Sequence, residues 1–210
     1  MSRLIVTNIE TQNIKFDSDT TAFTIGSDGV LSGTGSPAIV KLNTFTISSA
    51  VSSFTVDSTY INSTYDTYKF IYDLLPATDG TNLYNRAVVN GSVDTGNNYG
   101  FETFPLDGGS TRVSDSTNVM VVHNKYGIGN DAGAGISGEF TLFNVNSTTR
   151  SACVSGHSTG WEGTPVPTQM VFGGAYKSSE RAKVLNGFNF FMDDPTSDIA
   201  SGFITVYGVK

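Results

Sequence analysis

The two histidines are the first candidates for chemistry, because histidine is the usual base beside a nucleophilic serine or cysteine. His123 ends the apolar run 118–123, and His157 follows Ser155-Gly156 in a polar stretch. An apolar setting favours a packed histidine with a hydrogen-bonded ring nitrogen, and we expect neither histidine to serve a nucleophile elbow. The sequence therefore predicts no catalytic residue and a protein that is not an enzyme. The alternative is a triad assembled from distant segments.

Carboxylates are the second candidates. Asp193-Asp194 with Asp198, and Asp17 with Asp19, supply the oxygen ligands that Ca²⁺ prefers. The twelve-residue loop of a calcium-binding hand is absent, and aspartates of this kind commonly cap turns. We predict no metal site, with a structural cation as the alternative. A glycosidase pair could be drawn from several acidic residues, but nothing in their spacing selects one.

A glycine-rich run, residues 127–135, invites comparison with phosphate-binding loops. Its spacing differs from Gly-x-Gly-x-x-Gly, and no Lys-Ser or Lys-Thr pair follows it. We expect a surface loop at this position and no cofactor.

Trp161 is the single tryptophan of the chain, and it lies in a stretch, 156–168, that we expect to be a loop. Aromatic rings stack on the apolar faces of sugars and keep an amphipathic contact surface. Trp161 is therefore the best candidate for a glycan contact, with a rim residue packed on the fold as the alternative.

The elements that must position these residues are strands. Aromatic residues are frequent, with 14 Phe and 9 Tyr, and charged residues are only 15% of the chain. Short apolar runs separated by turn-forming clusters predict one all-β, antiparallel β-sandwich head over residues 59–210, with jelly-roll-like topology. The expected strands are 99–104, 118–123, 138–145, 150–157, 169–176, 184–192 and 202–209.

The stretch 59–86 is the clearest local signal. Aromatic residues from Tyr65 to Tyr72 approach a period of two, which predicts a strand with a buried face. Pro76 and Asp79-Gly80 then predict a turn that reverses the chain into a second strand. We interpret this unit as a hairpin of the core.

The segment 1–58 is sparse in apolar residues, so burial there returns too little free energy to offset the entropy of ordering the chain. We expect an extended, strand-rich docking and trimerisation segment that is ordered by other chains. Three stretches share the form Phe-Thr-[Ile/Val]-x-Ser, beginning at residues 23, 45 and 54. The expected contacts with a trimer partner or the capsid are Phe23, Ile25, Phe45, Ile47, Phe54 and Val56.

The charge and hydropathy patterns limit the classes of partner that we expect. The net charge is −7, and the 12 Lys and Arg residues are scattered, so no basic stripe is available for phosphates and nucleic acid is not expected as a partner. No apolar stretch approaches the length of a membrane span, so no membrane association is expected. The single cysteine, Cys153, cannot form an intrachain disulfide, which suits synthesis in a reducing cytoplasm.

Several stretches resemble the jelly-roll modules of virion surface proteins from tailed bacteriophages, and the resemblance covers about three quarters of the chain. They are Tyr65-x-x-Tyr68-x-Phe70-x-Tyr72, Pro76-Ala77-Thr78-Asp79-Gly80, Leu83-x-x-Arg86 and Ser201-Gly202-Phe203-Ile204-x-Val206-Tyr207-Gly208, together with the start Ser2-Arg3-Leu4-Ile5-Val6-x-Asn8-Ile9-Glu10. The resemblance implies a homotrimer with a compact β head and an N-terminal segment that docks on the particle. It does not distinguish capsid decoration proteins from tail fibres.

Three hypotheses follow from this resemblance. The first is a capsid decoration or cement protein, a homotrimer made in the host cytoplasm that binds the major capsid protein through residues 1–58. The second is a small tail fibre or receptor-binding protein that contacts tail proteins and, through Trp161 and the 127–135 loop, a host surface glycan. The third is a carbohydrate-active enzyme on the same fold.

Overall fold

The computed structural model describes residues 13–15, 21–25, 31–33, 38–106, 108–161, 167–177 and 183–210. The chain divides into two compact units, Met1–Val40 and Lys41–Lys210. In the first unit, β1 (Asn13–Lys15), β2 (Thr21–Ile25) and β3 (Leu31–Gly33) form an antiparallel sheet in the order β1-β2-β3. These strands are only three to five residues long.

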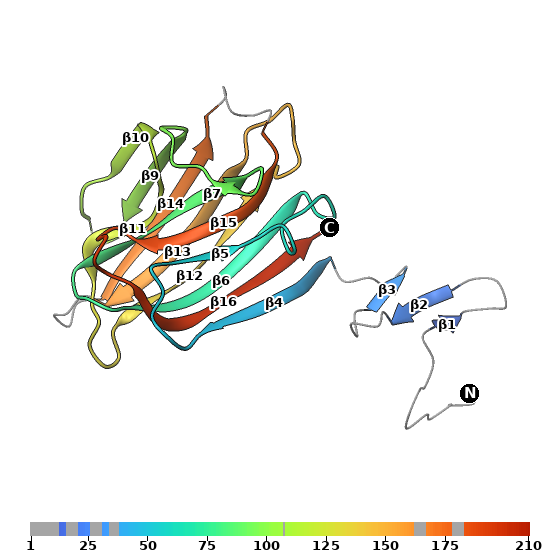
Figure 1. The fold of residues 1–210 in the computed structure, drawn as a ribbon, viewed down its shortest axis with the longest axis horizontal. Coiled ribbons are helices and arrows are strands. Elements are labelled where there is room, and N and C mark those ends of the chain that lie inside the picture. The colour runs from blue at the N-terminus through green and yellow to red at the C-terminus, as the bar shows by residue number, and fades with distance from the viewer. Residues whose placement is uncertain are drawn as a thin grey trace. The chain divides into compact units, whose positions relative to one another are not determined.

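The second unit is an antiparallel β-sandwich, as expected, and the described residues contain no helix (Figure 1). One sheet has the order β10-β9-β14-β13-β12-β6-β16-β4, and the other has the order β11-β7-β15-β5 with β8 paired to β7. The strands are β4 (Ile39–Ile47), β5 (Ser53–Val56), β6 (Thr67–Pro76), β7 (Thr81–Val89), β8 (Ser92–Val93), β9 (Tyr99–Pro105), β10 (Arg112–Thr117), β11 (Met120–Ile128), β12 (Gly135–Phe143), β13 (Cys153–Trp161), β14 (Pro167–Tyr176), β15 (Leu185–Met192) and β16 (Ile199–Val209).

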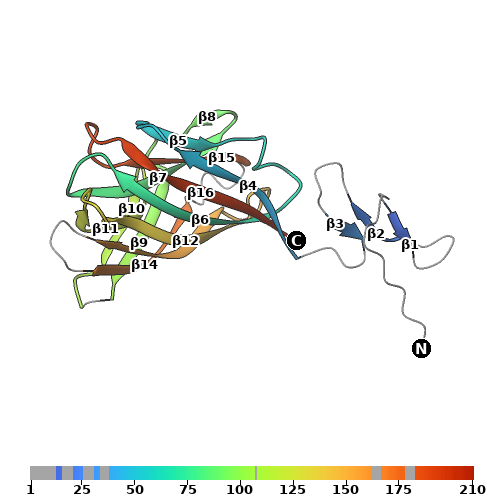
Figure 2. The same ribbon diagram turned by 90° about the horizontal axis from the view of Figure 1, so that it is seen from below.

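The pairing order of the sandwich is that of a jelly roll. β4 pairs with β16, β5 with β15, β6 with β12 and β7 with β11, so that early strands meet late ones in nested order. The chain passes between the sheets as it does so, and Figure 2 shows β5 and β15 on one side of β12 and β14. The expectation of jelly-roll-like topology therefore agrees with the strand pairing.

Two insertions enlarge this jelly roll. The segment between β7 and β11 contributes β9 and β10, and the segment between β12 and β15 contributes β13 and β14. Together they extend the larger sheet beyond β12 in the order β13-β14-β9-β10. We call these four strands the extension. Among them, β10 was not predicted, because Arg112–Thr117 is almost wholly exposed and has no apolar alternation.

The core between the sheets is aromatic. Phe140 stacks on Phe70, with ring centroids 4.6 Å apart, and its centroid lies 5.4 Å from that of Phe188 and 5.9 Å from that of Phe190. Phe70 and Phe140 come from the larger sheet, and Phe188 and Phe190 come from the smaller one. The predicted strands 138–145 and 184–192 therefore meet face to face through their apolar residues.

The hairpin expected over 59–86 is wrong. β6 and β7 are both present, but β6 pairs with β12 and β16 while β7 pairs with β11, β15 and β8. The turn at Asp79-Gly80 carries the chain from one sheet to the other, with Gly80 at φ +77°. A turn signal specifies a change of direction, and it does not specify which strands then pair.

The boundary expected between residues 58 and 59 is also displaced. β4 adds to the larger sheet beside β16, and β5 pairs with β15 in the smaller one. Residues 41–58 are therefore part of the sandwich. Their few apolar side chains did not predict a core, because the strands beside them, β15 and β16, lie about 130 to 160 residues later in the chain. The Asn189–Thr55 and Thr44–Thr205 side-chain hydrogen bonds span these separations.

A hydrogen-bonded carboxylate, that of Asp94, connects the first insertion to Tyr176 at the end of β14. Asp94 accepts hydrogen bonds from the Tyr176 hydroxyl, from the amide of Gly96 (2.8 Å) and from Nδ2 of Asn98 (3.2 and 3.0 Å). Burial raises the pKa of Asp94, but the hydrogen bonds from Tyr176, Gly96 and Asn98 outweigh it and lower the pKa below the ordinary aspartate value.

Asp94→Asn is expected to destabilise the protein by about 1 kcal/mol at neutral pH, because a charged acceptor near the surface is lost. Because the pKa of Asp94 is lower in the folded than in the unfolded protein, its carboxylate stabilises the fold fully above the unfolded pKa, about 3.9. This stabilisation is lost as the pH falls through the pKa of the folded state. The difference from wild type should therefore shrink in acid, as measured by urea unfolding across pH. Asp131→Asn, at an exposed aspartate, is the control. Parallel pH profiles for Asp94→Asn and wild type would contradict the assignment.

Candidate functional site

His123 lies in a closed polar cluster between the sheets. Its Nδ1 is 3.0 Å from Oγ of Ser158, and its Nε2 is 3.1 Å from Oγ1 of Thr168. Both hydroxyls also lie within hydrogen-bond distance of backbone carbonyls, of Val122 and of Gly160. All three side chains are at most 1% exposed, so no substrate reaches them. The expectation of a packed, hydrogen-bonded histidine at 123 is confirmed.

The sequence also contains one catalytic motif that was not predicted. Residues 156–160, Gly-His-Ser-Thr-Gly, have the form Gly-x-Ser-x-Gly, and Ser158 at their centre lies beside His123. A nucleophile elbow is a sharp turn from a strand to a helix that exposes its serine. Here the five residues lie within β13, and Ser158 is completely buried. The motif is therefore a strand segment, and the serine–histidine contact is structural.

His157 faces the opposite way, on the exposed face of the larger sheet. In the strand register it lies between Glu139 of β12 and Val171 of β14. Glu139 forms an ion pair with Lys69 at 2.9 Å. The structure therefore separates the two histidines, one in the core and one on the surface.

The aspartates proposed as an alternative cation site are used locally. Asp193 accepts hydrogen bonds from the amide and the side chain of Asn82, at 2.7 and 2.6 Å. Asp194 accepts from the amide and hydroxyl of Thr196, and these hydrogen bonds lower its pKa. Within the described residues, no three His, Cys, Asp or Glu side chains are grouped as a metal site would require. Asp17 and Asp19 lie outside the described residues.

The glycine-rich run 127–135 connects β11 to β12 and is tied to its neighbours. The amide of Asn130 donates to Asp79 and its side chain donates to the carbonyl of Ala77, both at 2.8 Å. The amide of Gly129 donates to the carbonyl of Trp161 at 2.7 Å. The loop and Trp161, which were proposed together as a glycan contact, are therefore adjacent in the structure.

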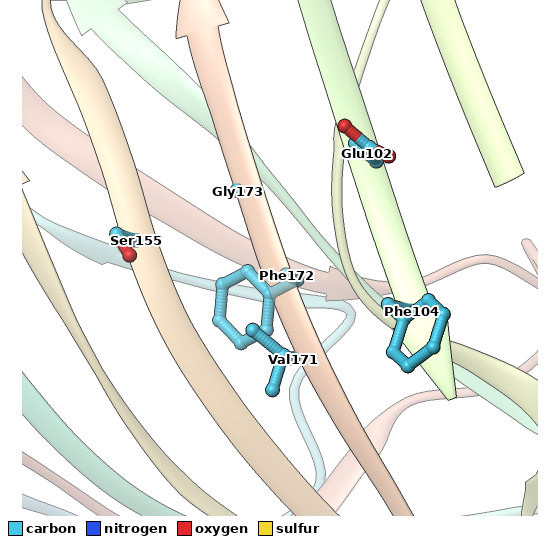
Figure 3. A pocket seen from close by; sticks show the side chains of 6 residues that line it. All are labelled: Glu102, Phe104, Ser155, Val171, Phe172 and Gly173. Carbon is cyan, nitrogen blue, oxygen red and sulfur yellow. The ribbon is translucent and has the colours of Figure 1, made fainter. Parts of the chain in front are cut away.

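An open hollow of about 270 Å³ lies on the exposed face of the extension. Figure 3 shows its lining on three neighbouring strands: Ser155 on β13, Val171 and Gly173 on β14, and Glu102 and Phe104 on β9. Val171 is in register with Phe104, and Gly173 is in register with both Ser155 and Glu102. The missing side chain at Gly173 leaves room between a serine hydroxyl and a carboxylate.

Large apolar side chains cluster around this hollow. Phe104 is 51% exposed, Leu106 50% and Val171 45%. Leu106 and Pro167 line a second, adjacent depression, and Pro167 is the register partner of Trp161, which is 43% exposed. The extension thus presents an aromatic and aliphatic surface with a few polar groups. Contiguous surfaces of this kind commonly mark interaction sites. Only Trp161 was predicted, because the register that joins it to Phe104 depends on the insertions.

The six residues expected to contact other chains have different positions. Ile47 and Val56 are buried in the core of their own sandwich, so they are not available to a neighbouring chain. Phe45 and Phe54 are partly buried and pack together, with centroids 5.2 Å apart. Their inward orientation follows from the incorporation of β4 and β5 into the sandwich. Phe23 and Ile25 are in β2, and their side chains lie outside the described part of the structure.

Comparisons with known proteins found no match: no family model, curated protein or solved structure matches this chain. No helix among the described residues has the length and apolar character needed to cross a membrane.

A substitution at Gly173 is expected to change the surface of the hollow without disturbing the fold. A Cβ at Gly173 would meet only the carbonyl oxygen of Val154, at 3.5 Å, whereas a Cβ at Gly156 would lie 2.3 Å from the carbonyl oxygen of Glu139. We expect Gly173→Val to change the free energy of unfolding by about 1 kcal/mol or less. Gly156→Val should lose at least about 3 kcal/mol or fail to fold. Chemical denaturation checks both, and equal losses at the two sites would contradict the geometry.

Proposed function

We propose that this protein is a structural component of a bacteriophage virion, most simply a capsid decoration protein. In this role the sandwich is displayed as a head on the capsid surface, and residues 1–40 dock on the major capsid protein. The protein is made in the host cytoplasm and acts as a homotrimer without a cofactor. The proposal retains the docking role of the N-terminal segment and moves its boundary from residue 58 to residue 40.

The observation that carries the proposal is the two-part architecture. The sandwich has a continuous aromatic core that includes β4 and β5, so from the first unit its sheets need only Ile39 and Val40, the first two residues of β4. The described strands β1, β2 and β3 of the first unit are three to five residues long, and its sequence is sparse in apolar residues. A short strand-rich segment of this kind gains most of its stability by adding to another chain.

The edge of the larger sheet supports association. β4 is a nine-residue strand that ends the sheet, and beyond its pairing with β16 no strand of the described residues pairs with it. Its exposed positions are mostly uncharged, and Ile39 is 50% exposed. Proteins commonly cover or charge long open edges, because unpaired backbone groups recruit further strands. A neighbouring chain of the trimer is the covering that we propose.

Purified virions and recombinant protein test this role. Quantitative mass spectrometry should give a copy number that follows that of the major capsid protein. The full chain should bind capsids lacking this protein. A chain that begins at residue 39, the start of β4, should fold normally but lose at least about tenfold in affinity, since the docking contacts are removed.

Sedimentation of the full chain at micromolar concentration should give a trimer. A copy number that follows the tail proteins would contradict the decoration role. Unchanged capsid binding by the shortened chain would contradict the docking role of the segment before β4, and a monomer would contradict the trimer.

A second candidate function is supported by the exposed surface of the extension. Phe104 presents an aromatic ring beside Ser155 and Glu102, which can hydrogen-bond to hydroxyl groups, and Trp161 presents a second exposed ring farther along β13. This combination suits a host surface glycan, as expected of a small tail fibre or receptor-binding protein.

For this second function, we expect glycan-array binding to fall at least about tenfold in Trp161→Ala and in Gly173→Val, since each removes or fills a contact surface. Phe203→Ala, at a similarly exposed aromatic residue of β16, is the matched control. Equal binding by all three variants would exclude Trp161 and the hollow at Gly173 as the glycan surface. Turnover of a host polysaccharide by wild type would instead support the enzyme hypothesis.

A further inference from the structure

Another pocket, at the boundary of the extension, has a different chemistry from the hollow in Figure 3. It has a volume of about 340 Å³ and is formed where β9 and β10 meet β7 and the start of β11. Its lining residues are Tyr84, Phe101, Arg112, Val113, Ser114, Thr117, Asn118, Val119 and Val121. Pockets of this size hold small ligands, and the lining combines apolar walls with a few polar groups.

Arg112 is the charged residue of this pocket, and it also lines a neighbouring pocket with Asn124 and Tyr126. The one ion pair among the described residues joins Lys69 to Glu139, so Arg112 pairs with no carboxylate there. Its side chain is exposed at the first position of β10. A guanidinium group without a protein carboxylate can bind a ligand carboxylate with two parallel hydrogen bonds.

The remaining walls supply groups that suit a sugar ring. Burial and the nearby charge of Asp193 raise the pKa of Tyr84, although Arg112 opposes the shift, so the phenol stays protonated and can donate a hydrogen bond. Ser114, Thr117 and Asn118 add hydroxyl and amide groups, and Phe101 adds an aromatic ring.

A second arginine, Arg86, holds one lining residue of the pocket, Asn118, in place. The guanidinium carbon of Arg86 lies 4.3 Å from the centroid of the Phe191 ring, and its Nε donates to the carbonyl of Asn118 at 2.9 Å. The turn between β10 and β11 is therefore fixed to β7 and β15. A fixed turn keeps the polar groups in position before a ligand arrives, which reduces the entropy cost of binding.

We propose that this pocket binds an acidic sugar, with Arg112 pairing with the sugar carboxylate and Tyr84, Ser114 and Asn118 contacting its hydroxyls. The ligand class is a hexuronic acid or another sugar that carries a carboxylate. The proposal rests on the second candidate function and deepens it, because it adds a contact surface distinct from Trp161 and names the kind of glycan. The protein is anionic overall, at net charge −7, so attraction of an anionic ligand to this pocket depends on the local charge of Arg112.

Titration of the ¹⁵N-labelled full chain with glucuronate tests the proposal. We expect amide shifts confined to residues near 84, 101 and 112–121, with a dissociation constant of about 1 mM or tighter. Glucose should bind at least about tenfold more weakly because it lacks the charge-assisted pair, and acetate should bind at least about tenfold more weakly because it lacks the ring. Added salt should weaken glucuronate binding, since the contact is partly ionic.

Arg112→Gln should weaken glucuronate binding at least about tenfold, and Arg112→Lys should recover part of the loss, because it restores the charge without the planar fork. Arg150→Gln, which removes an exposed arginine from the loop between β12 and β13, is the matched control and should bind like wild type. An unchanged affinity in Arg112→Gln, equal affinity for glucose, equal affinity for acetate, or no shift in this region would each overturn the proposal. The titration is independent of the particle experiments, so the sugar site and the virion role can fail separately.

Discussion

The sandwich depends on the aromatic contact between its two sheets. Phe140 of β12 touches Phe70 within its own sheet and Phe188 and Phe190 across the gap, and it has more ring contacts than any other residue in the described part of the chain. Each buried aromatic side chain contributes about 1.5 to 3 kcal/mol, and ring pairs add about 0.5 to 1.5 kcal/mol. The contact needs β6, β12 and β15 in register. β12 pairs with β13, which carries part of the hollow, and β15 pairs with β7, which lines the pocket beside Arg112.

The local part of this arrangement could be predicted from the sequence. Alternating aromatic residues indicated β6, and compact apolar runs indicated β12, β15 and β16, because the side-chain period of a strand is a local property. Pairing is not local. The sequence around Asp79-Gly80 looks like a hairpin turn, yet it joins strands of opposite sheets. β4 and β5 were assigned to a docking segment for the same reason, since the residues that bury Ile47 and Val56 lie far along the chain.

The site was predictable only in fragments. Trp161 was identified by residue type alone, and its exposure agrees with a role at the surface. The hollow farther along β13 could not be predicted, because Ser155, Gly173 and Glu102 come from three strands whose order in the sheet, β13-β14-β9, differs from their order in the sequence, β9-β13-β14. Arg112 gave no signal in the sequence, where it is one of 12 scattered cations. The histidines show the opposite case: the apolar run before His123 correctly indicated burial, whereas the motif around Ser158 looks catalytic only until the strand that contains it is seen.

The position of β16 has a consequence for the order in which the protein can be built. Residues 199–209 lie between β4 and β6 in the larger sheet, so the strands made first have no partner on this side until residues 199–209 have left the ribosome. Until then, β4 and β6 expose open backbone edges and one face of the aromatic core, which are features that promote aggregation. Folding must therefore wait for most of the chain, and pairing of such distant strands is slow. A nascent chain interrupted before residue 199 would be a substrate for chaperones or proteases, and only chains that extend beyond it can close the sandwich.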